Sequence, residues 1–422
     1  MALSGATLLL FTRTYPYGLS ETFIGTELPY LAAAWKRVVL VPWTVDGTRR
    51  PVPPNVEVDD SLGARGGLGK ALLPAAMARG TFWSAFFREF FSRPGLCARP
   101  GGAVRLAAYL ARAEAVRKWV LEKTRPFEET LCYTFWLGAQ TLGVGRAKSW
   151  NPGIRLISRV HRGDLYEEEA TPPYLPLRKE TLAGVDRLFC VSEHGLRYLG
   201  EKYSVGSGQC SVMRLGVEDP GFETRPSEDG IFRIASCSYL VELKRVGLLL
   251  EGVALLARRC PDLIIEWHHL GDGPLRASLE AHAKGALPDS VRCSFHGALE
   301  HAEVYGFYRS HPIDLFVNVS KSEGVPVSIM EAQSCGIPVL ATAVGGTPEI
   351  VRNGHGGVLL GENPSGQEVA LALERLAVDR SGLLSMRSAS RAAWREFSDA
   401  KVQYGEFVET LRGLIPYERS QG

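Results

Sequence analysis

Short apolar runs alternate along the chain with segments whose apolar residues recur every three to four positions, most clearly from residue 231 to 360. The runs predict buried strands, and the segments with a 3.6-residue period predict helices. In this half we expect strands at 231–238, 263–271, 291–297, 314–320, 338–344 and 357–360. Because these strands are almost entirely apolar, they indicate a parallel sheet covered by helices on both faces. The pattern therefore predicts a Rossmann-like α/β domain with its ligand at the carboxyl ends of the strands.

The N-terminal half repeats this pattern, with strands expected at 7–12, 37–43, 129–136, 154–161, 185–192 and 211–217. Two doubly wound domains facing a central cleft fit a chain of 422 residues, which exceeds the roughly 250–300 residues at which one hydrophobic core stops growing. Residues 218–230 are rich in Pro, Gly and acidic residues and lack an apolar period, so we expect a linker there. The predicted organisation is an N-terminal domain at 1–217, a C-terminal domain at 231–393, and a helix at 394–422 that packs back across the domains.

Composition narrows the class of protein. The chain has 45% hydrophobic and 22% charged residues, which is typical of a globular protein. Its formal charge is only +2, which excludes a positive potential over the whole surface of the strength that binding to nucleic acid needs. No apolar run reaches the roughly 18 residues that a membrane span needs. Eight scattered cysteines without a C-x-x-C pair favour a reducing compartment, so we expect a cytoplasmic protein.

Residues 61–125 differ from the rest, with twelve Lys and Arg against three Glu, a net charge of +9 that leaves −7 for the remainder. Within this stretch Phe82, Trp83, Phe86, Phe87, Phe90 and Phe91 recur at i, i+4 and i+8. An aromatic helix face among basic residues is typical of an interfacial membrane helix, and it is equally consistent with a helix that faces a core. The first interpretation implies peripheral contact with the inner face of the plasma membrane through residues 61–125.

The segment 320–351, SKSEGVPVSIMEAQSCGIPVLATAVGGTPEIV, holds the most informative chemistry. It reads as a strand end, a turn, a helix and the next strand. Glu323 falls in the turn and Glu331 inside the helix, so the two carboxylates can contact two parts of one extended ligand. The free N–H groups and positive dipole end at the start of this helix suit a diphosphate.

This E-x7-E pattern, followed by GIPVLATAVGGTPEIV, resembles the retaining GT-B glycosyltransferases of family 4 (group 1). The resemblance extends upstream through SYLVELKR (238–245), LGDGPL (270–275) and FHG (295–297), in the family's order. In the N-terminal half, PYGLSETFI (16–24), RVHRGDLY (159–166) and RLGV (214–217) are similar to the branch that builds bacterial exopolysaccharides, including the colanic-acid enzymes.

The resemblance implies roles for individual residues. Glu331 would hold the ribose of a nucleotide diphosphate-sugar, Lys244 would neutralise the diphosphate, and His161 would lie close to the transferred sugar as a hydrogen-bond partner. Catalytic candidates are thus His161 and Glu323. The other expected donor-binding residues are Lys244, Arg245, Gly324, Val325, Pro326, Val327 and Glu331, with Phe295, Gly297 and Leu299 lining the base pocket and Gly18, Glu21 and Asp164 on the acceptor side.

The chain departs from the family at Tyr239, where many members have an arginine five positions before the lysine, and Arg245 is the candidate to replace it. The expected reaction moves a hexose, with retention, from a nucleotide diphosphate-sugar to a saccharide acceptor that can be lipid-linked, in exopolysaccharide or lipopolysaccharide biosynthesis. We expect no metal and no cofactor. Two alternatives stay open: a sugar phosphorylase of the same fold, and a non-catalytic sugar-nucleotide binding protein.

Overall fold

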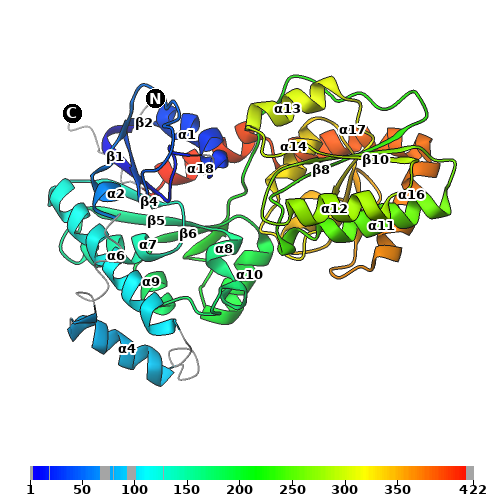
Figure 1. Cartoon of the computed structure of the whole chain (residues 1–422). Coiled ribbons are helices and arrows are strands. Elements are labelled where there is room, and N and C mark those ends of the chain that lie inside the picture. Colours follow the sequence, from blue (N-terminus) through cyan, green and yellow to red (C-terminus); the bar gives the residue numbers. More distant parts are fainter. Residues whose placement is uncertain are drawn as a thin grey trace. The chain divides into compact units, whose positions relative to one another are not determined.

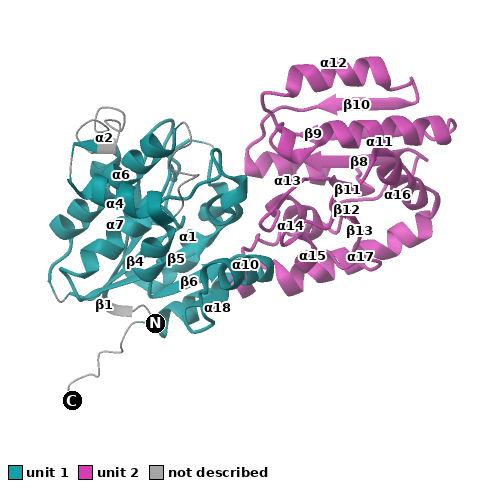
Figure 2. Cartoon of the chain, turned by 90° about the horizontal axis from the view of Figure 1, so that it is seen from below, with its two compact units in different colours: residues 1–213, 404–422 teal, residues 214–403 magenta. Residues whose placement is uncertain are grey.

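The computed structural model describes residues 3–18, 20–66, 77–78, 80–92, 101–126 and 128–414. The chain forms two compact units (Figure 2). Unit 1 comprises residues 1–213 and 404–422, and unit 2 comprises residues 214–403. No helix among the described residues is both long enough and apolar enough to cross a bilayer.

Unit 1 is built on a seven-stranded sheet with the order β3-β2-β1-β4-β5-β6-β7, in which all neighbouring strands are parallel. The strands are β1 (Leu3–Thr12), β2 (Trp35–Pro42), β3 (Val56–Val58), β4 (Thr130–Thr134), β5 (Ile154–Val160), β6 (Arg187–Cys190) and β7 (Cys210–Val212). The helices are α1 (Thr22–Ala34), α2 (Ser61–Gly66), α4 (Gly80–Ser92), α6 (Gly102–Lys123), α7 (Ala139–Lys148), α8 (Arg162–Leu165), α9 (Arg178–Ala183), α10 (Glu193–Tyr203) and α18 (Ala400–Arg412), with a 3-10 turn η1 (Glu167–Glu169).

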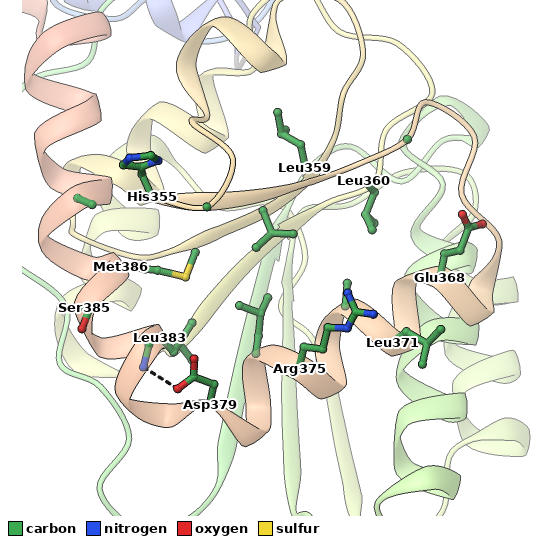
Figure 3. A pocket seen from close by; sticks show the side chains of 17 residues that line it. His355, Leu359, Leu360, Glu368, Leu371, Arg375, Asp379, Leu383, Ser385 and Met386 are labelled. Carbon is green, nitrogen blue, oxygen red and sulfur yellow. Dashed lines mark hydrogen bonds between the residues drawn. The ribbon is translucent and has the colours of Figure 1, made fainter.

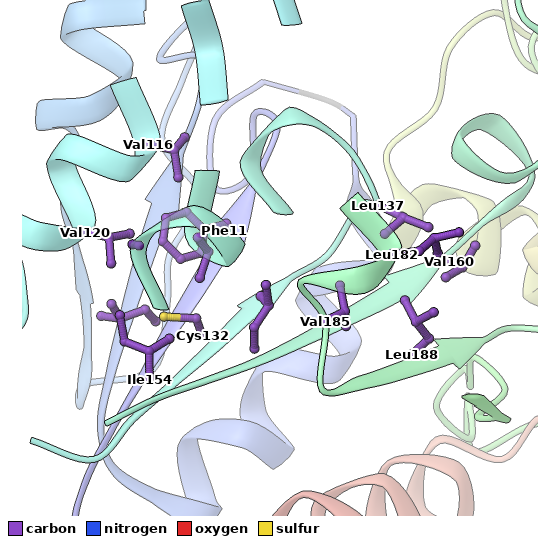
Figure 4. Close-up of a cluster of buried hydrophobic side chains, with 14 of the residues drawn as sticks. Phe11, Val116, Val120, Cys132, Leu137, Ile154, Val160, Leu182, Val185 and Leu188 are labelled. Carbon is purple, nitrogen blue, oxygen red and sulfur yellow. The ribbon is translucent and has the colours of Figure 1, made fainter. Parts of the chain in front are cut away.

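Alternate residues of these strands point to opposite faces of the sheet, and each face has its own helical cover. On one face, Phe11, Cys132 and Leu188 join Val116 of α6 and Leu182 of α9 in a single apolar cluster (Figure 4). On the other face, helix α18 covers the sheet, because the ring of Phe407 lies 5.6 Å from Tyr133 and 5.1 Å from Phe189. Burial on both faces explains why the strands are apolar throughout.

Unit 2, the green to orange part of the chain in Figure 1, has a six-stranded, all-parallel sheet with the order β10-β9-β8-β11-β12-β13, whose strands are labelled in Figure 2. The strands are β8 (Phe232–Cys237), β9 (Ile265–Leu270), β10 (Val291–Phe295), β11 (Leu315–Asn318), β12 (Val339–Thr342) and β13 (Gly357–Leu360). The helices are α11 (Val246–Arg259), α12 (Arg276–Ala286), α13 (His301–Ser310), α14 (Val327–Ser334), α15 (Thr347–Ile350), α16 (Gly366–Val378) and α17 (Arg380–Phe397), with a 3-10 turn η2 (Glu242–Lys244).

In both sheets the strand order reverses next to the first strand, between β1 and β4 and between β8 and β11. This 3-2-1-4-5-6 arrangement is the Rossmann order, and it opens a crevice outside the carboxyl ends of the strands at the point of reversal. The predicted fold class, two parallel α/β domains, is therefore confirmed. All twelve predicted strands are present, and the prediction missed β3, a three-residue edge strand too short to show a pattern.

The expected linker at 218–230 does not run free between the domains in the structure, because it packs onto unit 2. Thr224 N donates to the carbonyl of Cys335 at 2.9 Å, and Ser227 N donates to Asp314 Oδ1 at 2.8 Å. The division between the units falls at 213/214 instead, ahead of the Pro- and Gly-rich segment that suggested a linker.

The C-terminal pattern was expected to form one helix over 394–422, and here the prediction was wrong within the described residues. Trp394 lies in α17, and the backbone breaks before α18, because Val217 N donates to the carbonyl of Ser398 and Ala400 N donates to the carbonyl of Val217. Residues 415–422 lie outside the described part of the chain.

Helix α4 carries two rows of aromatic residues with different environments, instead of the single face that both interpretations assumed. Phe82 is buried and Phe86 and Phe90 pack against the same cluster, whereas Trp83, Phe87 and Phe91 are 47%, 49% and 78% exposed. Of the basic stretch that contains α4, residues 67–76, 79 and 93–100 lie outside the described residues.

Candidate functional site

The carboxyl ends of β8 and β11 meet where the strand order of unit 2 reverses, and two of the predicted site residues meet there too. Lys244 ends the turn η2 after β8, and its Nζ donates to Glu323 Oε1 at 2.5 Å, in the loop after β11. Asn318, the last residue of β11, donates to the same oxygen at 3.4 Å. Glu323 is only 6% exposed. A buried carboxylate and an ammonium from separate segments thus form an ion pair at the expected ligand edge of the sheet.

A glycine fixes the loop that carries Glu323. Gly345, in the loop after β12, has a φ of +53°, and a Cβ at this position would lie 1.9 Å from the carbonyl oxygen of Glu323. Beside it, Gly346 N donates to the carbonyl of Gly324 at 2.7 Å. Only a residue without a side chain lets the two loops approach this closely.

The turn from Gly324 through Val325 to Pro326 leads directly into α14, whose first residue is Val327. The first N–H groups of a helix have no acceptor within the helix, so they are available to a ligand at this edge of the sheet.

Glu331 lies one turn into α14, is 7% exposed, and has its Oε1 3.0 Å from Nδ1 of His301, the first residue of α13. The hydrogen bond with Glu331 raises the pKa of His301 above its ordinary value, against the opposing effect of burial. The ring of Tyr305 packs edge-on against the imidazole with centroids 5.0 Å apart. The carboxylate of Glu331 is thereby held through one oxygen by a half-buried imidazole.

The three predicted base-pocket residues lie at the carboxyl ends of β9 and β10. Phe295 ends β10, and its ring packs against His269 at 5.7 Å. Gly271 N donates to the carbonyl of Gly297 at 2.8 Å, which joins the two strand ends, and Leu299 follows half-buried. These residues therefore share the sheet edge that carries Lys244.

The side chain of Arg245, the candidate to replace the family's arginine, is engaged in hydrogen bonds to backbone carbonyls. Its guanidinium donates to the carbonyls of Val319 at 2.6 Å, Ser320 at 2.7 Å and Glu362 at 2.9 Å. Contact with a diphosphate would require some of these hydrogen bonds to break. Tyr239, which takes the arginine's position, is 62% exposed.

In unit 1, His161 follows β5 and lies against aromatic rings. Its imidazole centroid is 4.8 Å from that of Phe135 and 4.6 Å from that of Trp136. Burial, together with repulsion from Arg159 and Arg13, holds the pKa of His161 well below its ordinary range. Neither ring nitrogen has a hydrogen-bond partner among the described residues. The site therefore contains a neutral, buried imidazole with free hydrogen-bonding capacity.

The acceptor-side residues hold backbone loops around this imidazole. Glu21 accepts hydrogen bonds from Thr14 N at 2.6 Å and Tyr15 N at 2.8 Å, and from the indole N–H of Trp136. Asp164 accepts from Leu137 N and from His161 N, both at 2.7 Å, and burial raises the pKa of Asp164 to about 6. The carboxylates of Glu21 and Asp164 thus fix the backbone segments that surround His161.

Gly18, the third acceptor-side residue, has a φ of +63° and its carbonyl accepts from Arg50 Nε at 2.8 Å. It turns the same loop that Glu21 ties down.

Sequence reasoning missed several residues of these two clusters. Arg13 directly follows β1, Trp136 lies two residues beyond β4, and Asn318 is the last residue of β11. Polar or aromatic residues at the carboxyl ends of parallel strands are a usable signal for such positions. His301 offered no signal, because its pairing with Glu331 arises from the packing of α13 against α14.

Two cavities in the described structure lie apart from the predicted site residues. One, of about 860 Å³ in unit 2, is formed by β13, α16 and α17, with His355, Arg375 and Met386 among its lining residues (Figure 3). The other, of about 570 Å³, lies in unit 1 and is lined by residues that include Arg37, Asp59 and Lys123. Over the described residues, no group of three or more His, Cys, Asp or Glu side chains is arranged to hold a metal ion.

Comparison with known proteins bears on unit 2 in particular. The family described as "Glycosyl transferases group 1" matches residues 231–379. The amylovoran biosynthesis glycosyltransferase AmsK of Erwinia amylovora is 28% identical over 267 residues, which is 61% of this chain and 62% of that protein. The putative colanic acid biosynthesis glycosyltransferase WcaL of Salmonella typhimurium is 26% identical over 273 residues, 59% of this chain and 63% of that protein. Both matches span less than two thirds of the relative's own length.

Among solved structures, Anabaena HepE in complex with UDP and glucose superposes with a TM-score of 0.63 at 15% identity, over 96% of this chain and 99% of that one. Residues 231–379 therefore form a glycosyltransferase group 1 domain, and the fold of the chain is GT-B.

Proposed function

We propose that this protein is a retaining glycosyltransferase that moves a hexose from a nucleotide diphosphate-sugar to a saccharide acceptor in exopolysaccharide or lipopolysaccharide biosynthesis. The observation that carries the proposal is the pairing of Lys244 with Glu323, eight positions before Glu331, at the strand reversal of the group 1 domain. The names of AmsK and WcaL, which refer to amylovoran and colanic acid biosynthesis, support the polysaccharide class.

The donor binds at the carboxyl edge of the second sheet. Glu331 accepts hydrogen bonds from the ribose through the carboxylate oxygen that His301 leaves free, and the first N–H groups of α14 hold the diphosphate. Lys244 exchanges part of its contact with Glu323 for the diphosphate, which frees Glu323 to bind the sugar hydroxyls. Phe295 packs on the base. Arg245 shapes this edge through its carbonyl contacts.

The saccharide acceptor binds at the carboxyl edge of the first sheet, and His161 at this edge is a hydrogen-bond partner for a hydroxyl of the transferred sugar. A buried imidazole without a partner is unfavourable, and a substrate hydroxyl that pairs with it removes that cost. Because the pKa of His161 is held low, its role is that of a neutral hydrogen-bond partner.

Transfer proceeds by attack on the face of the sugar that the diphosphate leaves. The bond from the anomeric carbon to the diphosphate oxygen breaks, the bond to the acceptor oxygen forms, and the acceptor proton passes to the departing diphosphate. Lys244 stabilises the negative charge that develops on the leaving group, so the reaction needs no metal ion.

We propose further that unit 1 contacts the inner face of the plasma membrane through the exposed row Trp83, Phe87 and Phe91. Aromatic rings at successive turns insert at the level of lipid headgroups, and the +9 charge of residues 61–125 complements anionic lipids. The buried row of α4 anchors the helix to its own unit while the exposed row stays available.

The enzymatic proposal is tested by nucleotide release from UDP-, GDP-, ADP- and TDP-sugars, with and without membrane lipid extract and with EDTA. We expect release from one donor that persists in EDTA, rises with lipid extract and is lost in Glu331→Ala. The control Glu368→Ala changes an exposed residue of α16 and leaves release intact. Formation of a sugar 1-phosphate from free phosphate without nucleotide would establish the phosphorylase alternative, and donor binding without turnover would favour the binding-protein alternative.

Membrane contact is tested by sedimentation with vesicles of about 30% phosphatidylglycerol in phosphatidylcholine, which present an anionic surface. We expect wild type to sediment and the triple variant Trp83→Ser, Phe87→Ser, Phe91→Ser to stay in the supernatant. Val402→Ser, which removes another exposed apolar side chain, is the control. Equal sedimentation of the triple variant and wild type would contradict the contact.

A further inference from the structure

Two arginines of unit 1 lie on tryptophan rings at the carboxyl edge of the first sheet. Arg13 follows β1, and its guanidinium carbon is 4.2 Å from the ring centroid of Trp136, which lies just beyond the end of β4. Arg112, on α6, is 4.6 Å from the ring centroid of Trp43, which follows β2. Each guanidinium thus lies over an indole ring, a contact that does not use its N–H groups.

The backbone brings the two arginines together. Trp43 N donates to the carbonyl of Thr12 at 3.1 Å, and Thr44 N donates to the carbonyl of Arg13 at 2.7 Å. The two cations also repel one another. The pKa of Arg112 is lowered mainly by desolvation and, to a smaller extent, by repulsion from Arg13. Two positive groups at one sheet edge therefore lie close enough to repel one another.

Within the described residues, neither guanidinium forms a salt bridge or a side-chain hydrogen bond. The carboxylates of Glu21 and Asp164 lie at the same edge. Their oxygens accept hydrogen bonds from backbone N–H groups and, for Glu21, from the indole N–H of Trp136. By contrast, Arg37, Arg146 and Arg159 of the same unit each pair with a carboxylate. Asp164 attracts Arg13 electrostatically without forming a salt bridge with it. Neither cation therefore has a carboxylate in direct contact, and an anion bound between the two would reduce their mutual repulsion.

We propose that Arg13 and Arg112 form an oxyanion site that binds a phosphoryl or carboxylate group of the acceptor. Guanidinium groups present paired N–H donors whose geometry matches both oxyanions. The site adjoins the proposed sugar site, because the ring of Trp136 contacts both Arg13 and His161. The assignment to the acceptor rests on the proposed function, whereas the binding of an oxyanion by these residues does not.

The consequence is a specificity for charged saccharides. A neutral sugar of the same size would leave both guanidinium groups without their partner and would bind more weakly. The acceptor is then either a sugar that carries a carboxylate or one that carries phosphate, including the phosphate of a lipid-linked saccharide.

The test is calorimetric titration of the full chain with three probes: glucose 6-phosphate, glucuronate and glucose. We expect at least one of the two anionic probes to bind and glucose to bind about tenfold or more weakly, the loss of one charge-assisted hydrogen bond. Binding of glucose 6-phosphate alone identifies phosphate as the group recognised, and binding of glucuronate alone identifies a carboxylate.

Variants locate the site. Arg13→Gln and Arg112→Gln should each weaken the anionic probe by about tenfold or more, and the lysine variants at the same positions should retain part of the affinity. Arg155→Gln, an exposed arginine at the other end of β5, is the matched control and should bind as wild type does.

Lys244→Gln separates this site from the donor site of unit 2 and should leave probe binding unchanged. Anion binding that survives both arginine variants, or that is lost in Lys244→Gln, would overturn the inference, as would equal affinity for glucose and the anions. None of these titrations requires turnover, so they succeed or fail independently of the nucleotide-release assay.

Discussion

Gly345→Ala tests the packing that positions Glu323. The substitution places a Cβ 1.9 Å from the carbonyl oxygen of Glu323, whereas real Cβ atoms do not approach closer than about 3.0 Å, so one loop must move by roughly 1.1 Å. A displacement of about 1 Å at a catalytic site lowers turnover by about 10²-fold. Because Gly345 also has a φ of +53°, alanine costs about 1–2 kcal/mol of backbone strain in addition.

A matched control separates the collision from the strain. Gly354 has a φ of +77°, and a Cβ there meets no atom within 4 Å. Gly354→Ala should therefore lose about the same 1–2 kcal/mol of stability in urea unfolding while keeping its rate of nucleotide release. Gly345→Ala should lose about 10²-fold in kcat/KM at temperatures where it remains folded.

The comparison has a clear contrary outcome. If Gly345→Ala releases nucleotide as fast as Gly354→Ala, then the close approach of the two loops does not control the geometry of Glu323, and its placement at the donor site is wrong.

Three further predictions follow from buried or paired charges. Arg159→Met should destabilise unit 1 by about 3–5 kcal/mol in urea unfolding, because the buried Glu27 loses its cationic partner at 3.1 Å and keeps only the hydrogen bond from the Tyr133 hydroxyl. Adding Glu27→Leu should recover much of the loss, and an additive double variant would contradict the pairing. His161→Phe should make the stability of the protein less sensitive to acid. The pKa of His161 is depressed in the folded state, so the stability of wild type falls as the pH drops below about 6.5, by up to about 1.4 kcal/mol per pH unit from this group. If the stabilities of wild type and variant change in parallel from pH 7 to 5, His161 is not a buried neutral imidazole. His301→Gln should flatten the pH dependence of donor binding. Glu331 raises the pKa of His301, so the charge-assisted hydrogen bond between them is present at low pH and is lost as the pH rises through that pKa. Wild-type affinity for the donor should therefore fall about fivefold in calorimetric titrations over this range, and an unchanged profile in the variant would exclude His301 as the support of Glu331.

The sequence predicted those features that depend on local pattern. The strands ending at Thr12 and Val160 were visible because burial on both faces makes them apolar throughout, and the turn at Glu323 was visible from its Gly and Pro residues. The pairing of Lys244 with Glu323 follows from the strand order, which the alternation of strands and helices indicated only in outline.

Other features depend on contacts that no local pattern encodes. The pairing of His301 with Glu331 and the placement of Arg112 on Trp43 arise when helices settle against neighbours far away in the sequence. The division into units at 213/214 was missed for a similar reason, since the Pro- and Gly-rich residues 218–230 satisfy their hydrogen bonds on unit 2. In α4 the spacing of the aromatic residues was correct, but two adjacent rows with opposite environments share that spacing.

The central claim is that unit 2 holds a nucleotide diphosphate-sugar at the carboxyl ends of β8 and β11. The most direct measurement is calorimetric titration of UDP, GDP, ADP and TDP into wild type, Lys244→Gln and Glu331→Gln, with Arg155→Gln as the control. We expect one nucleotide to bind wild type and the control equally, and both site variants to bind it about tenfold or more weakly. Binding of no nucleotide, or of one with the same affinity in all four proteins, would contradict the claim.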